Sequence, residues 1–168
     1  MIQQLQPVRR DVVVRASQEA AFTMFTGGID RWWPRAHHIG NADLAEVVLE
    51  PREGGRWYAR HVDGSETSTG YVIEWEPHDR VVLAWQVGAD WKYDPTLVTR
   101  VEVRFIAEAP DRTRVELEHG DLERFGPAAE KMRDTFDRPG AWDATLVAFA
   151  AVVATQPSAP DLINNQEA

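Results

Sequence analysis

Two histidines at the ends of predicted strands carry the side chains best suited to acid–base chemistry or ligand binding. By strand alternation, His119 shares a face with Val115 and Leu117, and His61 shares one with Trp57. An imidazole that projects into an apolar cavity can hydrogen-bond a ligand carbonyl or act as a general base. The competing interpretation is a strand-end histidine hydrogen-bonded to the backbone. For either histidine alone, we favour this structural role.

Glu74 is a carboxylate that could complete an acid–base pair with one of these histidines. Its strand is apolar on both faces (residues 71–73 and Trp75), so alternation does not decide whether Glu74 faces a cavity or the back of the sheet. An enzyme of the cyclase, aromatase or hydrolase type would use His119 with Glu74 or His61. Positioned pairs of this kind supply ~10²–10⁴-fold in rate. No motif in the sequence demonstrates such a pair, and catalytic residues stay unassigned.

The chain also carries seven tryptophans in 168 residues. Trp57, Trp85 and Trp142 fall on predicted inward faces. Such rings either fill a core or line a cavity for an aromatic ligand. The first interpretation is the stronger for each ring taken alone, whereas the set as a whole favours a cavity.

Composition excludes several classes of function. The chain has no cysteine, which rules out disulfides, thiolate nucleophiles and zinc–thiolate sites. His37 and His38 with Asp43 lack a further ligand at a suitable spacing, so we expect no metal and no cofactor. A net charge of −9 argues against a nucleic-acid partner or an anionic membrane surface. No apolar run approaches the roughly 20 residues of a membrane span. Residues 1–7 lack the basic start and apolar core of a signal sequence, so we expect no export. We therefore expect a cytoplasmic protein.

The elements that must position these side chains are an antiparallel sheet and a covering helix. Alternating or β-rich segments predict strands at 8–15, 45–49, 56–61, 66–76, 80–87, 97–107 and 112–119. Ser17 is a predicted N-cap for a short helix at 18–25, with a second short helix at 29–33 and a polar helix near 128–137. The final helix, 141–154, has an apolar stripe formed by Trp142, Leu146, Phe149 and Val153. This β-α-α-β6-α order predicts an α+β fold with the last helix across the concave face of the sheet.

Several motifs in this order are similar to those of a known family. They include Trp32-Trp33-Pro34, Glu53-Gly54-Gly55-Arg56-Trp57, the segments 70–77, 80–85 and 113–120, and Pro139-Gly140-Ala141-Trp142. Together they resemble the activator-of-heat-shock-protein-90-ATPase homologue-like family, within the START-like (SRPBCC) helix-grip superfamily. The resemblance covers residues 8–155 and implies one domain there, with tails at 1–7 and 156–168. It also implies a curved seven-stranded sheet around the C-terminal helix, with a pocket between them that two short helices close at one end.

Our main functional expectation is a small protein that binds an apolar or aromatic molecule in that pocket. The resemblance places Trp32 and Trp33 at the pocket rim. The full set of expected ligand-binding residues is Trp32, Trp33, Trp57, His61, Trp85, His119, Trp142, Leu146 and Phe149. A His119→Ala change is expected to remove one hydrogen bond, at a cost of about 1–2 kcal/mol.

Three alternatives stay open at this point. The first is the enzyme described above. The second is a co-chaperone that activates a heat-shock ATPase, as the family name implies. The third is an oligomeric regulatory protein without chemistry. A second copy of the chain and a chaperone are therefore candidate protein partners.

Overall fold

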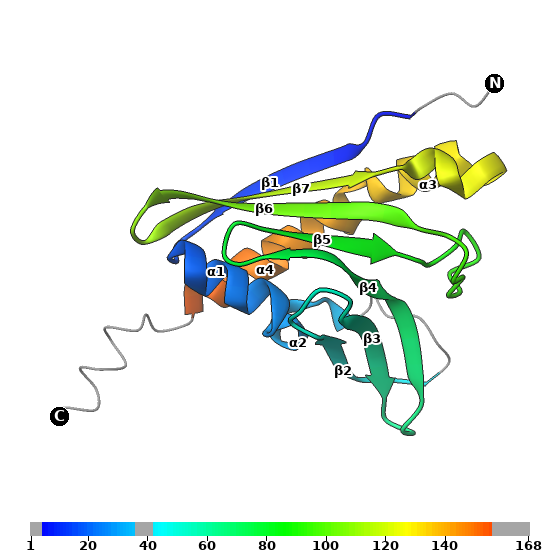
Figure 1. The fold of residues 1–168 in the computed structure, drawn as a ribbon, viewed down its shortest axis with the longest axis horizontal. Helices are drawn as coiled ribbons and strands as arrows, with labels where there is room; N and C mark the ends of the chain where they lie inside the picture. The colour runs from blue at the N-terminus through cyan, green and yellow to red at the C-terminus, as the bar shows by residue number, and fades with distance from the viewer. Residues whose placement is uncertain (1–4, 36–41, 156–168) are drawn as a thin grey trace.

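Seven strands form one antiparallel sheet in the order β1-β7-β6-β5-β4-β3-β2, which curves around the C-terminal helix α4 (Figure 1). This architecture comes from a computed structural model that describes residues 5–35 and 42–155. The strands are β1 Val8–Val14, β2 Leu44–Leu49, β3 Arg56–His61, β4 Glu66–Glu76, β5 Arg80–Trp85, β6 Thr99–Ala109 and β7 Arg112–Gly120. The helix-grip fold expected from the sequence is confirmed.

Helices follow β1 and β7. Helix α1 (Gln18–Thr26) begins at Ser17, whose Oγ accepts a hydrogen bond from the Ala20 N–H at 3.1 Å, so the predicted N-cap is confirmed. The short helix α2 (Ile29–Trp32) comes next. After β7, an irregular helical segment (Leu122–Ala128) leads into α3 (Ala129–Phe136). Figure 1 shows α4 (Ala144–Thr155) crossing behind the sheet.

The predicted final helix is wrong in one respect: it is not continuous from residue 141. A π-type turn covers Pro139–Asp143, and Ala141 within it has non-helical angles (φ −96°, ψ −119°). Proline lacks an N–H and glycine is conformationally permissive, so the Pro139-Gly140 pair favours a break there. Trp142 therefore lies in the turn before α4 rather than on the regular helix.

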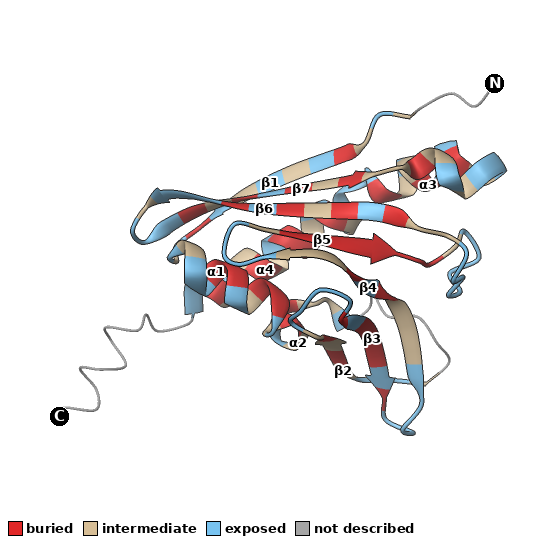
Figure 2. Ribbon diagram, viewed as in Figure 1, coloured by how far each residue is buried: buried red, intermediate tan, exposed pale blue. Residues whose placement is uncertain are grey.

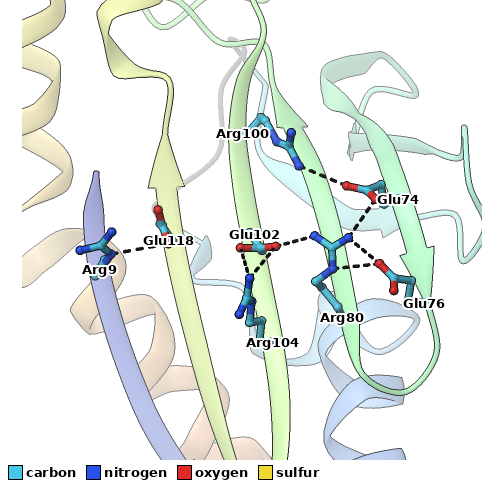
Figure 3. A network of polar contacts seen from close by, with 8 residues as sticks. All are labelled: Arg9, Glu74, Glu76, Arg80, Arg100, Glu102, Arg104 and Glu118. Carbon is cyan, nitrogen blue, oxygen red and sulfur yellow. Dashed lines mark hydrogen bonds and ion pairs between the residues drawn. The ribbon is translucent and has the colours of Figure 1, made fainter. Parts of the chain in front are cut away.

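The two faces of the sheet differ in chemistry along β6, where apolar side chains alternate with charged ones. Val101, Val103 and Phe105 of β6 are buried on the inner face, and Figure 2 shows buried positions alternating with others along that strand. The side chains between them, Glu102 and Arg104, belong to an ion-pair network on the outer face (Figure 3). The inner face therefore supplies the apolar surface that α4 and the other helices cover.

Gly70 lies where three strands meet closely. On β4 it is paired with Trp57 of β3 on one side and with Trp85 of β5 on the other. A Cβ atom built on Gly70 would lie 1.7 Å from the Ala84 carbonyl oxygen, far inside the contact distance. The Trp57 and Trp85 rings come together in this row, with centroids 5.8 Å apart. Glycine at this position is thus required by the backbone approach between β4 and β5.

We predict that Gly70→Ala destabilises the protein by at least about 2 kcal/mol, because β4 and β5 must separate to admit the methyl group. The midpoint of urea unfolding, followed by far-UV circular dichroism, measures this loss. Gly140→Ala is the matched control, since nothing lies within 4 Å of a Cβ built there. Equal midpoints for the two variants would contradict the assignment.

Candidate ligand-binding site

A set of aromatic rings from six segments meets between the sheet and the C-terminal region. The edge-on pairs include Trp33–Trp57 (centroids 5.8 Å apart) and Trp85–Trp142 (5.9 Å). Trp33 also approaches Trp142 at 6.2 Å. Such T-shaped contacts are a favoured geometry for aromatic rings. We call this set the central aromatic cluster; its members are Trp33, Trp57, Trp85, His119, Phe136 and Trp142.

The central aromatic cluster runs from the surface of the protein into its core. Trp33, which directly follows α2, is half-buried, whereas the other five members are buried. Trp33 therefore lies at the outer end of the cluster, and its role at the rim of a pocket stays a prediction. His119 and Phe136, with centroids 4.5 Å apart, lie at the inner end.

The remaining predicted site residues divide into two groups. Trp32 and Phe149 are in ring contact with each other at 5.2 Å, and Leu146 is buried in the same core. Trp32 adjoins Trp33 at 5.7 Å, so this group borders the cluster. His61 is placed elsewhere, on β3 beside the β3–β4 hairpin, where its Nε2 lies 2.7 Å from Thr67 Oγ1. The structure thus brings together eight of the nine residues in one continuous core and separates His61 from the cluster.

His119 is held by hydrogen bonds on both ring nitrogens. The Trp142 indole N–H donates to Nδ1 at 3.1 Å, which makes Nδ1 the acceptor. Nε2 must then carry the proton, and it donates to Thr99 Oγ1 at 2.8 Å. Thr99 in turn donates to the Trp85 carbonyl oxygen at 3.2 Å. This chain of three bonds leaves neither ring nitrogen for a substrate.

Burial sets the protonation state of His119. The side chain is 0% exposed, and desolvation lowers its pKa from 6.5 to about 3. The ring is therefore neutral at physiological pH. A general base would need a pKa near the working pH and a free nitrogen. In this arrangement His119 meets neither requirement and acts as a structural connector.

The expected cost of His119→Ala must also be corrected. The sequence predicted the loss of one hydrogen bond, but the ring makes two and contacts Phe136 and Trp142 as well. Truncation would leave a buried indole N–H without its acceptor and open a cavity. Each of these effects alone costs about 1–3 kcal/mol, so the total exceeds the predicted 1–2 kcal/mol.

Glu74 lies on the opposite face of the sheet from His119. Its carboxylate pairs with Arg80 and Arg100 in the outer network (Figure 3). A register shift between Val72 and Glu74 in the β4–β5 pairing explains why alternation could not place this residue. The predicted acid–base partnership of His119 with Glu74 is therefore wrong, because the sheet itself separates the two side chains.

The sequence-based prediction missed Thr99 and Phe136. Thr99 has the same strand parity as Val101 and Val103, and it is fully buried opposite Trp85. Phe136 follows Met132 by four residues on an otherwise polar helix, and both are buried. Strand parity and helical spacing were thus visible signals for these two residues.

The described part of the chain contains neither a metal-ligand cluster nor a helix that could span a membrane. Within residues 5–35 and 42–155, no group of three or more histidine, aspartate or glutamate side chains could hold a metal ion. No helix in that part of the chain is long and apolar enough to cross a membrane. The pair His37 and His38 lies outside the described residues.

The chain is similar to one protein family and to several solved structures. A family model for Activator of Hsp90 ATPase homolog 1-like protein matches residues 15–154. The structure of Txn09, an anthrahydroquino-γ-pyrone synthase, is 34% identical, with 90% of this chain and 99% of that chain covered and a TM-score of 0.63. CalC, a self-sacrificing resistance protein from Micromonospora echinospora, is 28% identical, with 88% and 94% covered and a TM-score of 0.67. The Aha1 dimer from Colwellia psychrerythraea is 12% identical, with 90% and 98% covered and a TM-score of 0.58, a likeness of fold alone. A search of the curated proteins found none that matches.

The lowered pKa of His119 makes stability depend on pH. Below about pH 6.5 the unfolded chain takes up a proton at His119, whereas the folded protein does not until about pH 3. The free energy of unfolding therefore falls as the pH drops through this window. Between pH 7 and pH 5, we expect wild type to lose about 1–2 kcal/mol more than His119→Gln, which cannot titrate.

Urea unfolding of both proteins at several pH values tests this prediction. The other histidines and the carboxylates are common to the two proteins, so their contributions cancel in the difference. Parallel stability profiles for wild type and His119→Gln would contradict a buried, neutral His119.

Proposed function

This chain belongs to the family of Activator of Hsp90 ATPase homolog 1-like proteins, and from that premise we propose that it binds an aromatic small molecule between its sheet and its C-terminal helix. The observation that carries the proposal is the continuous run of rings from half-buried Trp33 to buried Trp142 and Trp85. A flat ligand that enters beside Trp33 would exchange ring–ring contacts within the protein for contacts of the same kind with itself.

The character of the interior supports an apolar ligand. The polar groups of His119, Thr99 and Trp142 are hydrogen-bonded to one another, so they provide few free hydrogen-bonding groups for a charged ligand. A ligand as large as a tryptophan side chain buries about 150–250 Å², worth roughly 4–6 kcal/mol before ordering costs. Dissociation constants for two-ring ligands should therefore fall near the millimolar to high-micromolar range, and those of larger ring systems lower.

Similarity to characterised proteins supports the same class of ligand. Txn09 is named for an anthrahydroquino-γ-pyrone and shares about a third of its residues with this chain over nearly its whole length. CalC is named as a self-sacrificing resistance protein and has the highest TM-score of the structures compared above. We carry over from Txn09 only the class of molecule, a fused aromatic ring system.

The proposal is of a binding protein rather than an acid–base enzyme. A cyclase, aromatase or hydrolase mechanism through His119 would need a proton-accepting nitrogen, and both ring nitrogens are hydrogen-bonded. The co-chaperone role, the homodimer and the cytoplasmic location stay predictions, because the likeness to the Aha1 dimer concerns the fold alone.

We predict that Trp33→Ala weakens the binding of a planar aromatic probe by about fivefold or more, because the ring lost is the one that meets the ligand at the rim. The probe is 1,4-naphthoquinone, and equilibrium dialysis gives its dissociation constant without relying on tryptophan fluorescence. Trp91→Ala is the matched control: Trp91 is 46% exposed on the β5–β6 loop and is no member of the cluster.

The proposal fails if wild-type protein does not bind the probe at millimolar concentration. It also fails if Trp33→Ala and Trp91→Ala bind the probe as tightly as wild type does. In that case any binding would be elsewhere on the surface.

A further inference from the structure

The position of Trp33, the outermost ring of the central aromatic cluster, is set by the short helix α2. Trp33 is the C-cap of this helix: its N–H donates to the Ile29 carbonyl oxygen at 3.0 Å, and its backbone is already extended (φ −62°, ψ 126°). Isolated helices shorter than about 12 residues are marginal in water, and α2 has four residues. The direction of the Trp33 ring therefore depends on the contacts that hold α2 in place.

The first of these contacts is the buried ring of Trp32, which is 3% exposed. Its N–H donates to the Met24 carbonyl oxygen at 3.0 Å, and the ring packs against Phe25 and Phe149. This contact fixes α2 at one point of the core. A single anchor leaves rotation of the helix about that point unrestrained, so it does not by itself fix the ring that follows.

The second contact is the carboxylate of Asp30, one oxygen of which accepts two hydrogen bonds. The donors to Oδ1 are the backbone N–H of Val47, at 2.9 Å, and Arg35 Nη1, at 2.7 Å. Val47 belongs to β2, the last strand in the sheet order, so its N–H lies on the outer edge of the seven-stranded sheet. Figure 1 shows α2 beside β2 at this edge. Asp30 thus ties α2 to the sheet at a second point.

Asp30 is ionised, although its side chain is partly buried. Burial tends to raise the pKa of the carboxyl, but the hydrogen bonds from Arg35 and from the Val47 N–H outweigh it and hold the pKa below its ordinary value of 3.8. Hydrogen bonds to a charged group are stronger than neutral ones. Asp30 and Arg35 lie on either side of Trp33 in the sequence. The charged contact therefore closes a short loop of chain that contains Trp33.

We infer that Asp30 is a positioning residue for ligand binding: it holds α2 against the edge of β2 and so keeps the Trp33 ring in the central aromatic cluster. The ring centroid of Trp33 lies 5.8 Å from that of Trp57 and 6.2 Å from that of Trp142. A side chain that is already in place loses less freedom when a ligand binds, so the affinity is higher. This inference rests on the proposed function and adds to it the residue that preorganises the contact at Trp33. Asp30 touches no ligand in this account.

A double-mutant cycle with Trp33 distinguishes this role from a merely structural one. Equilibrium dialysis gives the dissociation constant of 1,4-naphthoquinone for wild type, Asp30→Ala, Trp33→Ala and the double variant, and far-UV circular dichroism shows that each is folded. We expect Asp30→Ala to weaken binding about two- to fourfold, because the Trp33 ring must then be ordered by the ligand. In the Trp33→Ala background the same change should have no effect, because the ring on which it acts is absent.

Glu46→Ala is the matched control. Glu46 precedes Val47 on β2, and its carboxylate accepts a hydrogen bond from Arg60 at 2.6 Å, so this variant removes an ion pair of the same strand and keeps Asp30. It should bind the probe as wild type does. The positioning role is overturned by an equal loss from Asp30→Ala with and without Trp33, by no loss in either background, or by the same loss in Glu46→Ala. Failure of wild type to bind the probe overturns the proposed function itself.

Hydrogen exchange of the wild-type protein covers the case in which Asp30→Ala does not fold. A ligand that contacts Trp33 favours the state in which Asp30 holds α2 to β2, so it should slow exchange of the Val47 amide. The amides of β1, on the opposite edge of the sheet, report the general stabilisation by the ligand. With saturating naphthoquinone we expect the Val47 amide to slow by about twofold or more relative to those of β1. A Val47 amide that slows no more than the β1 amides contradicts the inference.

Discussion

The hydrogen bond from the Trp142 indole to His119 connects the two halves of this fold. His119 belongs to the end of β7, where it pairs with Val8 of β1 and Val101 of β6, and Trp142 belongs to the turn that precedes α4. Because the acceptor nitrogen lies in a dry interior, the bond competes with no water and fixes the start of α4 against the sheet. Thr99 extends the chain to β5 through the Trp85 carbonyl. The placement of the covering helix, and of the rings gathered beneath it, depends on this buried polar connection.

On the outer face of the sheet, polar side chains are paired through ion pairs rather than through buried neutral hydrogen bonds. Arg80 contacts Glu74, Glu76 and Glu102 there, so one half-buried guanidinium joins three strands. The hydrogen bond with Glu102 raises the pKa of Arg80, so its charge is retained at any physiological pH. Exposed ion pairs of this kind contribute little to stability one by one. Together they cover this part of the outer face with charged side chains, whereas the apolar surface that the helices cover lies on the inner face.

Strand periodicity predicted most of the fold, because residues such as Val101 and Val103 alternate strictly with charges and meet one covered face. It also placed Trp57, Trp85, His119 and Trp142 inward, and all four are buried. The failures have local causes. Glu74 follows a bulge that breaks the period of two, and the Pro139-Gly140 pair interrupts the helical period before Trp142. Pattern reasoning could not show that both nitrogens of His119 are occupied, because hydrogen-bond partners from β6 and the Pro139–Asp143 turn meet only in three dimensions.

Positions around the central aromatic cluster differ in how readily they can be substituted, and Gly70 is the most restricted of them. Between Trp57 and Trp85 the sheet presents only the backbone of Gly70, which we call the floor of the cluster. It lies so close to the Ala84 carbonyl oxygen that no side chain can be added. The walls, in contrast, are side chains from the end of α2 and from the turn before α4, and those segments are outside the hydrogen-bonded ladder. Relatives that accommodate ligands of different size would therefore diverge at the position of Trp33, while Gly70 and the Trp142–His119 pair stay constant. The fold separates a part that evolution can remodel from a part that it must keep.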